Sequence, residues 1–418
     1  MIVGQAARSR AAFVFIFVTV LLDMLALGVI VPVLPALVLQ FKTGDTASGA
    51  IVYGLFATVW SVMQFVFSPV LGSLSDRFGR RTVILLSNVG LGLDYVLMAV
   101  APSLWWLFLG RVVSGITSSS LPTATAYIAD VTPPEQRAEK FGMLGVSFGI
   151  GFIVGPSVGG LLGGISLRAP FWGAAALSLA NAGYGYFILP ESLPPERRRP
   201  FHWTRANPIG AINLLRSKPQ LFALGFAGFL SMLGHDSLPI MAVIYMQYRF
   251  QWTQLTMGLV LALVGAASVV VQGGLVGRIV RAVGERRALA LGLASGASAM
   301  LVYALAPTGA LFLTGIVMTA LYGLANPALQ SLMTRRVDAT EQGRLQGANG
   351  SLQGIASMAA PTLFTWAFAV GIGPAVNLPG APFLLAAGFL VAALIVSWAA
   401  IGMGAQESVA EQRDSAGR

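Results

Sequence analysis

Gly72-Ser-Leu-Ser-Asp76-Arg77-Phe-Gly79-Arg80-Arg81 is a short charged turn between two long apolar runs. We expect Gly72 to end the preceding run and to let another backbone come close, because glycine has no side chain. One aspartate and three arginines in so few residues are too little chain for a domain. The stretch therefore predicts a loop between two membrane-spanning helices. It is either an ordinary loop or a gate in which Asp76 and the arginines form and break contacts.

The composition indicates a membrane protein that crosses the bilayer several times. Of the 418 residues, 56% are hydrophobic and 10% are charged, against about 25% charged residues in a soluble domain. The absence of cysteine excludes disulfides, thiolate metal sites and cysteine nucleophiles. The net charge of +10 does not indicate nucleic-acid binding, because the basic residues recur in short loops between apolar runs. We expect no cofactor and no metal site. The first run lacks a small-residue cleavage site, so we expect it to be retained rather than removed as a signal peptide.

The apolar runs give the expected architecture. A spanning helix needs about 20 apolar residues, and the sequence contains twelve runs of that kind. They lie at roughly 11–39, 48–72, 82–101, 104–130, 138–164, 170–190, 219–245, 254–280, 287–306, 309–335, 342–370 and 380–403. We predict an all-α membrane protein of twelve transmembrane helices in two bundles of six, residues 1–190 and 219–403. A basic cytoplasmic linker, 191–218, joins the bundles, and a disordered cytoplasmic tail, 404–418, follows them.

The distribution of lysine and arginine predicts the topology. With the N-terminus inside, 22 of the 26 basic residues lie on the cytoplasmic side, where such residues accumulate. The outer loops hold only Lys42, Arg168 and Arg249, and Arg111 lies within a run. We therefore expect a multi-pass protein of the cell (inner) membrane with both termini cytoplasmic. The segment 274–287 repeats the opening motif without its central aspartate, as parallel repeats would.

Ionisable residues inside the runs are candidates for proton coupling: Asp23, Asp94, Arg111, His235 and Asp236. A charge at the bilayer centre costs about 2.5–3.5 kcal/mol on insertion scales, so such residues usually have a function. Arg111 stays protonated, and Asp23 is its candidate partner by depth. Neighbouring residues on a helix point about 100° apart, so His235 and Asp236 should face different surroundings. At each position the alternative is a structural role, as a fixed salt bridge or a buried polar pair.

Amide side chains and small residues complete the candidate set. Predicted substrate contacts are Gln64, Asn326, Gln330, Asn349 and Gln353, because an amide both donates and accepts hydrogen bonds. Hydrogen bonding between helices is the alternative for each. In the fifth run, small residues recur every four positions and predict a flat groove for close helix packing. The residues concerned are Gly151, Gly155, Pro156, Gly159 and Gly160, of which the proline should kink the helix.

Several motifs resemble those of a known family. The opening motif and Leu109-Gly110-Arg111-Val-Val-Ser-Gly115 are similar to motifs of the major facilitator superfamily of transporters. The pattern of residues 151–160 is similar to the signature of its antiporters. Matches to the tetracycline-efflux family of drug/proton antiporters extend from helix one to helix eleven. They are Leu22-Asp23, Gly28, Pro32-Val-Leu-Pro35, Leu93-Asp94-Tyr95, Ile128-Ala129-Asp130, Pro327-Ala-Leu-Gln330 and Leu345-Gln-Gly347.

The resemblance implies the export of a tetracycline-like molecule, alone or as a divalent-metal chelate, in exchange for protons by alternating access. It implies that Asp23, Asp94 and Arg111 are essential charges. It also implies a cytoplasmic gate made of Gly72, Asp76, Arg77, Gly79, Arg80 and Asp130. The chain departs from the family at Ser268 and Gly296, where members carry a histidine and an aspartate. The ionisable residues that this chain has instead are His235 and Asp236, in the seventh run.

The expected partners are a small-molecule substrate, protons and the lipid bilayer, and a monomer is expected to suffice. The nearest alternative is a facilitator that exports another drug, a sugar or a metabolite. A receptor or a membrane enzyme would need a sizeable domain outside the membrane. The longest interruption between runs is only the linker at 191–218, so the sequence does not favour these classes.

Overall fold

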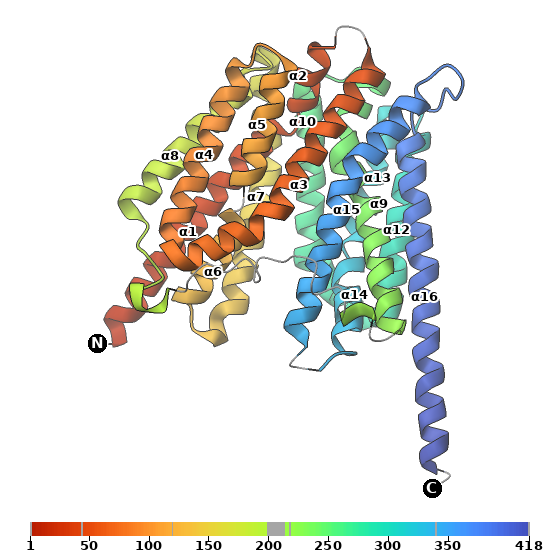
Figure 1. Ribbon diagram of the computed structural model, residues 1–418. Coiled ribbons are helices and arrows are strands. Elements are labelled where there is room, and N and C mark those ends of the chain that lie inside the picture. Colours follow the sequence, from red (N-terminus) through yellow and green to blue (C-terminus); the bar gives the residue numbers. More distant parts are fainter. Residues whose placement is uncertain are drawn as a thin grey trace. The chain divides into compact units, whose positions relative to one another are not determined.

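The computed structural model describes residues 2–42, 45–118, 120–198, 214–216, 219–338 and 341–416, and the regular elements in these ranges are helices (Figure 1). The first half contains α1 (Ile2–Ile30), α2 (Leu34–Gln40), α3 (Thr46–Phe78), α4 (Arg80–Val100), α5 (Leu104–Thr117), α6 (Ser120–Val131), α7 (Pro134–Ile165), α8 (Ala169–Ile188) and η1 (Pro195–Arg197). The second half contains α9 (Pro219–Phe250), α10 (Gln254–Val270), the π-helical segment η4 (Val271–Leu275), α11 (Val276–Val283), α12 (Glu285–Leu305), α13 (Gly309–Tyr322), α14 (Ala325–Thr334), α15 (Gln342–Gly371) and α16 (Ala381–Ala416).

The helices confirm a multi-pass membrane protein. Within the described residues, 10 helical segments are long and apolar enough to cross a membrane. Two expected runs are not among them. The run at 170–190 forms α8, whose mean hydropathy is lowered by Asn181, two tyrosines and several glycines. The run at 104–130 is divided into α5 and α6. The count of twelve therefore stays a prediction.

Proline accounts for the division of two of the expected runs, 104–130 and 309–335. Pro122 is the third residue of α6 and Pro327 is the third residue of α14. Proline has no N–H, so the carbonyl four residues earlier cannot be bonded and the helix breaks there. Between α13 and α14 the chain makes tighter turns, with Gly323 N–H to Ala320 O at 3.0 Å. Each half thus has a broken helix where the sequence predicted a continuous one.

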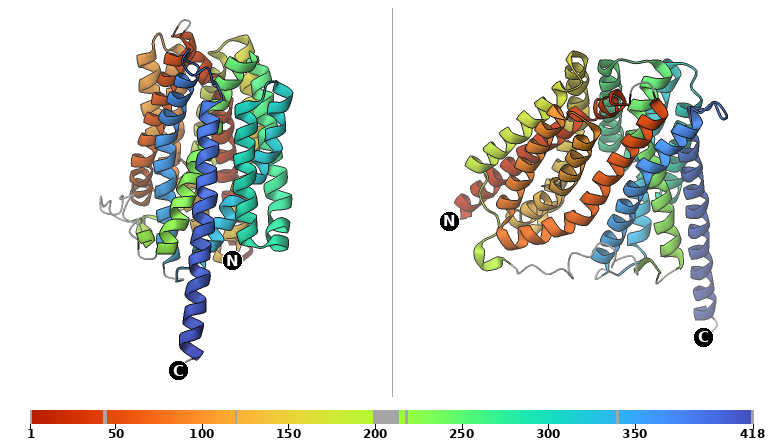
Figure 2. Two further views of the ribbon diagram at one scale, coloured as in Figure 1. Left: turned by 90° about the vertical axis from the view of Figure 1, so that its right-hand side faces the viewer. Right: turned by 45° about the horizontal axis from the view of Figure 1, so that its top comes forward.

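The chain forms two compact units. The first comprises residues 1–207 and 246–266, and the second comprises 208–245 and 267–418. In the first unit α1 packs against α7 and α8, and α4 packs against α5 and α8 (Figures 1 and 2). In the second unit α12 packs against α13, α14 and α16. The predicted division differs in that 246–266 join the first unit. Residues 199–213 and 217–218 of the expected linker lie outside the described residues.

The two units have separate apolar cores. In the first, buried residues of α1, α4 and α8 surround Phe56, Leu107 and Phe171. In the second, the ring centroid of Tyr303 lies 4.5 Å from that of Phe312 and 5.8 Å from that of Phe383, and all three residues are buried. Such aromatic residues bury large areas in the centre of a helical unit. These cores hold the polar side chains described below at fixed positions.

The C-terminal segment differs from the expectation. The sequence predicts a disordered tail at 404–418, but α16 continues as a helix to Ala416 and extends well past the other helices of its unit (Figures 1 and 2). Its last part, Ala405-Gln-Glu-Ser-Val-Ala-Glu-Gln-Arg413, consists largely of strong helix formers. Polarity alone was therefore a poor guide to disorder here.

Candidate functional site

The charged turn between α3 and α4 is organised by Arg80, the first residue of α4. Gly79 before it has a φ of 101°, a conformation that favours glycine and lets the chain turn sharply. The Arg80 guanidinium lies 2.6 Å from the Asp76 carboxylate and 3.2 Å from that of Asp130. It also donates to Ser75 Oγ at 2.5 Å. Arg80 therefore connects α3, α4 and α6, and the structure brings together three of the predicted gate residues.

Glu191 completes this cluster and was not predicted. Its Oε1 accepts hydrogen bonds from the backbone N–H of Arg80 at 2.9 Å and of Arg81 at 3.5 Å. The same oxygen accepts from Ser192 and Leu193 at 3.0 and 3.1 Å. The first N–H groups of a helix have no partner within it, so Glu191 acts as a cap for α4. The signal in the sequence is an acidic residue directly after Pro190, where the sixth run ends.

A further contact joins the cap to the ion pairs. Ser192 Oγ donates to Asp130 Oδ2 at 3.1 Å, the same oxygen that accepts from Arg80. Arg198 lies 4.0 Å from Glu191 Oε2. The ends of α3, α4, α6 and α8 are thus held by one connected set of polar contacts. A movement of any one of these helices must break some of them.

Two residues of the expected gate behave differently from the prediction. The helix does not end at Gly72, because α3 continues to Phe78. No atom lies within 4 Å of a Cβ built on Gly72, whereas one built on Gly79 would collide with the Glu191 carboxylate. The close approach is therefore at Gly79. Arg77 is exposed, with its guanidinium carbon 5.0 Å from the centroid of the Phe78 ring.

Asp23 is buried on α1 and bonded to α8. Its Oδ1 accepts from Asn181 Nδ2 at 2.9 Å, and the same nitrogen donates to the backbone oxygen of Thr19 at 2.9 Å. Asn181 is fully buried. Sequence reasoning missed it, although a lone amide in an apolar run was a usable signal. Hydrogen bonds to a charged group are stronger than average, so Asn181 positions Asp23.

Arg111 on α5 is buried, and Asp94 on α4 is the acid whose charge acts on it most strongly. The pairing of Arg111 with Asp23, inferred from depth, stays a prediction. The guanidinium carbon of Arg111 lies 5.2 Å from the centroid of the Trp60 ring, within reach of a cation–π interaction. In this unit Asp23 is thus hydrogen-bonded to Asn181, and the guanidinium of Arg111 lies near the Trp60 ring.

The glycines of α7 pack as the sequence predicted. Gly151, Gly155 and Gly159 lie against the backbone of α1, where a Cβ on Gly155 would come 2.7 Å from Gly28 Cα. Gly160 lies against Gln254 of α10, in the same unit. Pro156 lies inside α7, and its carbonyl approaches Gly258. The role of this groove in antiport stays a prediction.

His235 and Asp236 on α9 contact different helices. The imidazole of His235 stacks on Tyr322 of α13, with ring centroids 4.6 Å apart and planes at 16°. Asp236 Oδ2 accepts from Ser357 Oγ of α15 at 2.9 Å. Tyr322 is itself fixed by a 2.8 Å hydrogen bond between its hydroxyl and that of Ser231. The two residues are therefore placed to respond to different parts of the second unit.

The predicted amides divide into two groups. Gln330 Oε1 accepts from Gln346 at 3.2 Å and from Asn349 at 3.4 Å, which joins α14 to α15. In the first unit Gln64 donates to Ser118 Oγ at 3.3 Å. The other two, Asn326 and Gln353, are exposed, and the described part of the chain offers them no hydrogen-bond partner. Bonding between helices thus occurs for part of this set, and substrate contact stays a prediction.

The second unit repeats the charged turn with the signs reversed. Gly284 has a φ of 79° and precedes Glu285, the first residue of α12. Arg335 lies 2.7 Å from Glu285. The partners are 50 positions apart in both units, Arg80 with Asp130 and Glu285 with Arg335. The first residue of the helix is the cation of the ion pair in the first unit, Arg80 of α4, and the anion in the second unit, Glu285 of α12.

Comparison with known proteins places this arrangement in a family. The tetracycline resistance protein, class C, of Escherichia coli is 38% identical over 362 residues, covering 87% of this chain and 91% of that protein. The class G protein of Vibrio anguillarum is 36% identical over 375 residues, covering 87% and 92%. The crystal structure of nucleoside transporter NupG superposes with a TM-score of 0.75 at 14% identity, covering 93% of this chain and 99% of that one. A model of the Major Facilitator Superfamily matches residues 16–361, and the chain belongs to that superfamily.

Proposed function

We propose that this transporter exports a tetracycline-like drug in exchange for protons. The observation that carries the proposal is the pair of buried carboxylates in one unit, Asp23 on α1 and Asp94 on α4. Buried acids in membrane spans are expensive and usually mark proton or substrate pathways. The similar proteins of Escherichia coli and Vibrio anguillarum are named for tetracycline resistance. Membership of a transporter superfamily places the chain outside the enzymes.

The proposed topology is twelve spans with both termini in the cytoplasm of a bacterial inner membrane. The basic residues then lie inside, as they do in most membrane proteins. On this topology the Arg80 cluster lies at the cytoplasmic ends of α3, α4 and α6. A monomer is proposed to suffice, with the proton gradient as the energy source and no cofactor. The drug would be carried alone or as a divalent-metal chelate.

In the proposed mechanism a proton entering from outside neutralises one of Asp23, Asp94 and Asp236. A neutral acid is a weaker acceptor than a carboxylate, so protonation of Asp23 would weaken its bond from Asn181. Protonation of Asp94 would remove the anion beside Arg111. Either change alters the packing of α1, α4, α5 and α8. Each unit of pKa by which the two conformations differ provides 1.36 kcal/mol toward the switch.

The test is drug uptake into inverted membrane vesicles under an imposed pH gradient. The parent, Asp23→Asn and Asp94→Asn are compared with Glu196→Gln, an exposed residue of η1, as the control. We expect gradient-driven uptake in the parent and the control and its loss in the two Asn variants. Equal uptake in all four proteins would remove both carboxylates from the mechanism.

A second candidate is the export of another amphiphilic compound by the same mechanism. Ser268 and Gly296 stand where the resemblance expects a histidine and an aspartate, and this departure favours testing a wider range of substrates. Uptake should be measured over a compound panel, with tetracycline first, both with and without Mg²⁺. Uptake of an unrelated drug in preference to tetracycline would support the second candidate.

A further inference from the structure

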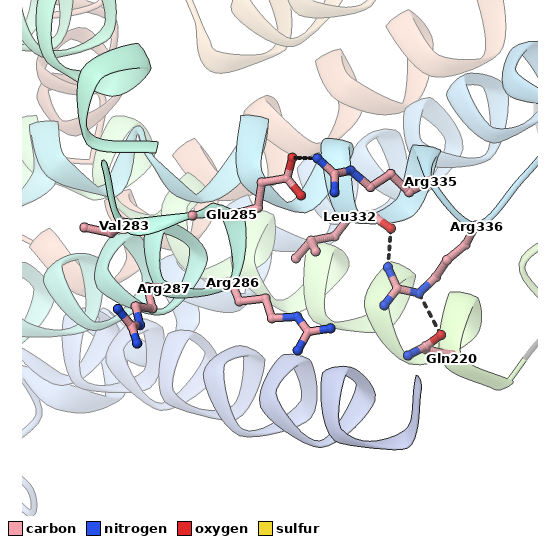
Figure 3. A pocket seen from close by; sticks show the side chains of 9 residues that line it. Gln220, Val283, Glu285, Arg286, Arg287, Leu332, Arg335 and Arg336 are labelled. Carbon is pink, nitrogen blue, oxygen red and sulfur yellow. Dashed lines mark hydrogen bonds and ion pairs between the residues drawn. The ribbon is translucent and has the colours of Figure 1, made fainter. Parts of the chain in front are cut away.

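A basic cavity of about 550 Å³ lies in the second unit, where α12 begins. Its charged lining consists of Arg286, Arg287, Arg335, Arg336 and Glu285, four cations and one anion, of which Arg335 points at Glu285 (Figure 3). The lining comes from the turn at Gly284, from the ends of α12 and α14, and from Gln220 at the start of α9. All of these belong to one unit. The cavity takes no part in the mechanism proposed above.

The single acid of the cavity is already neutralised. Glu285 Oε1 accepts from Arg335 at 2.7 Å and from Ser331 at 2.6 Å. Arg336 donates to Gln220 at 2.7 Å and also to the backbone oxygen of Leu332. Figure 3 draws the contacts of Glu285 with Arg335 and of Arg336 with Gln220 and Leu332, and no contact from Arg286 or Arg287. Among the side chains that line the cavity, none forms a hydrogen bond or an ion pair with Arg286 or Arg287.

The first unit shows what occupies the equivalent place. There the turn after Gly79 leads into α4, and the N–H groups of Arg80 and Arg81 donate to the Glu191 carboxylate. In the second unit Gly284 and Glu285 hold the positions of Gly79 and Arg80. Here the N-cap residue of α12 is Gly284, and none of the side chains that line the cavity accepts a hydrogen bond from the first N–H groups of the helix. The turn of the second unit therefore has basic side chains and backbone donors, but its lining has no carboxylate in the place that Glu191 occupies in the first unit.

We propose that this cavity binds a phosphate group, with Arg286 and Arg287 as the main contacts. A guanidinium presents paired donors that match phosphate oxygens and stays charged when bound. The positive end of α12 adds to the attraction. The phosphate belongs either to the headgroup of an anionic phospholipid or to a soluble phosphate. On the proposed topology the cavity faces the cytoplasmic leaflet, where basic pockets between helices bind lipid headgroups. The inference depends neither on the drug nor on proton exchange.

The experiment measures binding to the full chain in nanodiscs of neutral phosphatidylcholine. The chain has no cysteine, so Val283→Cys in the cavity wall can carry a single environment-sensitive fluorophore. Ala282→Cys, one residue away and outside the lining, is the control label. Inorganic phosphate is titrated in one arm, and phosphatidylglycerol replaces part of the lipid in the other, at constant ionic strength set with chloride. A response in the lipid arm alone identifies a headgroup site, and a response to inorganic phosphate identifies a soluble ligand.

Variants then test the assigned contacts. We expect Arg286→Gln and Arg287→Gln to weaken binding about ten-fold each, the usual effect of losing a charged hydrogen bond. Arg281→Gln removes the same charge from a neighbouring residue outside the cavity and should bind as the parent does. If either variant unfolds, the shift in the thermal unfolding midpoint of the parent on adding either ligand replaces it. The proposal is refuted if neither ligand changes the parent, or if Arg281→Gln loses as much affinity as the cavity variants.

Discussion

Replacing Glu191 should loosen the start of α4 and with it the Arg80 cluster. Glu191 Oε1 accepts four backbone N–H groups, two from the first turn of α4 and two from its own loop. In Glu191→Ala all four donors lose this acceptor. Loss of a helix cap costs about 1 kcal/mol, with a range of roughly 0.5–2. Loss of a negative charge at a helix N-terminus adds about 0.3–1 kcal/mol.

The expected decrease in the free energy of unfolding is therefore about 1–3 kcal/mol for Glu191→Ala. Glu191→Gln keeps an acceptor oxygen at the same place and loses only the charge, so it should lose about 0.3–1 kcal/mol. The side chain is 25% exposed, and solvent screening favours the lower part of both ranges. The assay is unfolding of the detergent-solubilised protein by SDS, followed by tryptophan fluorescence.

The control for this prediction is Glu196→Ala, which makes the same chemical change at an exposed residue of η1. It should leave the free energy of unfolding unchanged. If Glu191→Ala were as stable as this control, the capping argument would fail. If Glu191→Gln lost as much as Glu191→Ala, the charge rather than the acceptor geometry would account for the effect.

Two further substitutions test the packing of the first unit. Asn181→Leu removes the hydrogen bond to Asp23 and should destabilise the protein by about 1–3 kcal/mol in the same assay. Asn88→Leu is its control, because Asn88 is also fully buried but has no hydrogen-bond partner among the described residues; equal losses in both would contradict a specific role for Asn181. Gly155→Ala would force a Cβ into the backbone of α1 and should cost about 1–3 kcal/mol. Gly145→Ala on the same helix has open space and should be neutral or stabilising by up to about 1 kcal/mol; a similar cost at both positions would show that helix propensity, not packing, decides.

Much of the fold could be predicted from the sequence because the membrane imposes simple rules. Apolar runs of spanning length located most of the helices, and glycines spaced by four predicted close helix packing at α7, although not that its partner would be α1. The breaks at Pro122 and Pro327 were missed because hydropathy does not change there. The effect of proline on backbone bonding is a separate signal from hydropathy. The tail of α16 was missed because polar residues with high helix propensity resemble a disordered segment in composition.

The candidate site was harder to predict, because burial depth does not determine which residues meet. Asp23 and Arg111 were matched by depth, but depth gave no sign that Asp23 is hydrogen-bonded to Asn181 of α8. Depth leaves the rotation of each helix undetermined, and rotation decides which side chains meet. Glu191 was missed for another reason. It lies 111 positions along the chain from Arg80, whose backbone N–H it caps. No local sequence pattern therefore connects the two residues.

The repeat between the two halves helps to separate structural residues from functional ones. Both α4 and α12 have 21 residues, follow a glycine with positive φ and begin with a charge paired to a residue 50 positions on. Because both halves retain these features, the features are best explained by the helix geometry that the two halves share. The buried charges are not shared. Counted from the starts of α4 and α5, Asp94 and Arg111 correspond to Ala299 of α12 and Ile316 of α13. A structural requirement of the repeat would apply to both units. Asp94 and Arg111 are buried at a cost and have apolar counterparts in the second unit, which favours a functional over a structural role for this pair; in the proposed exchanger of drug for protons we expect that role to be proton coupling, shared with Asp236 of the second unit.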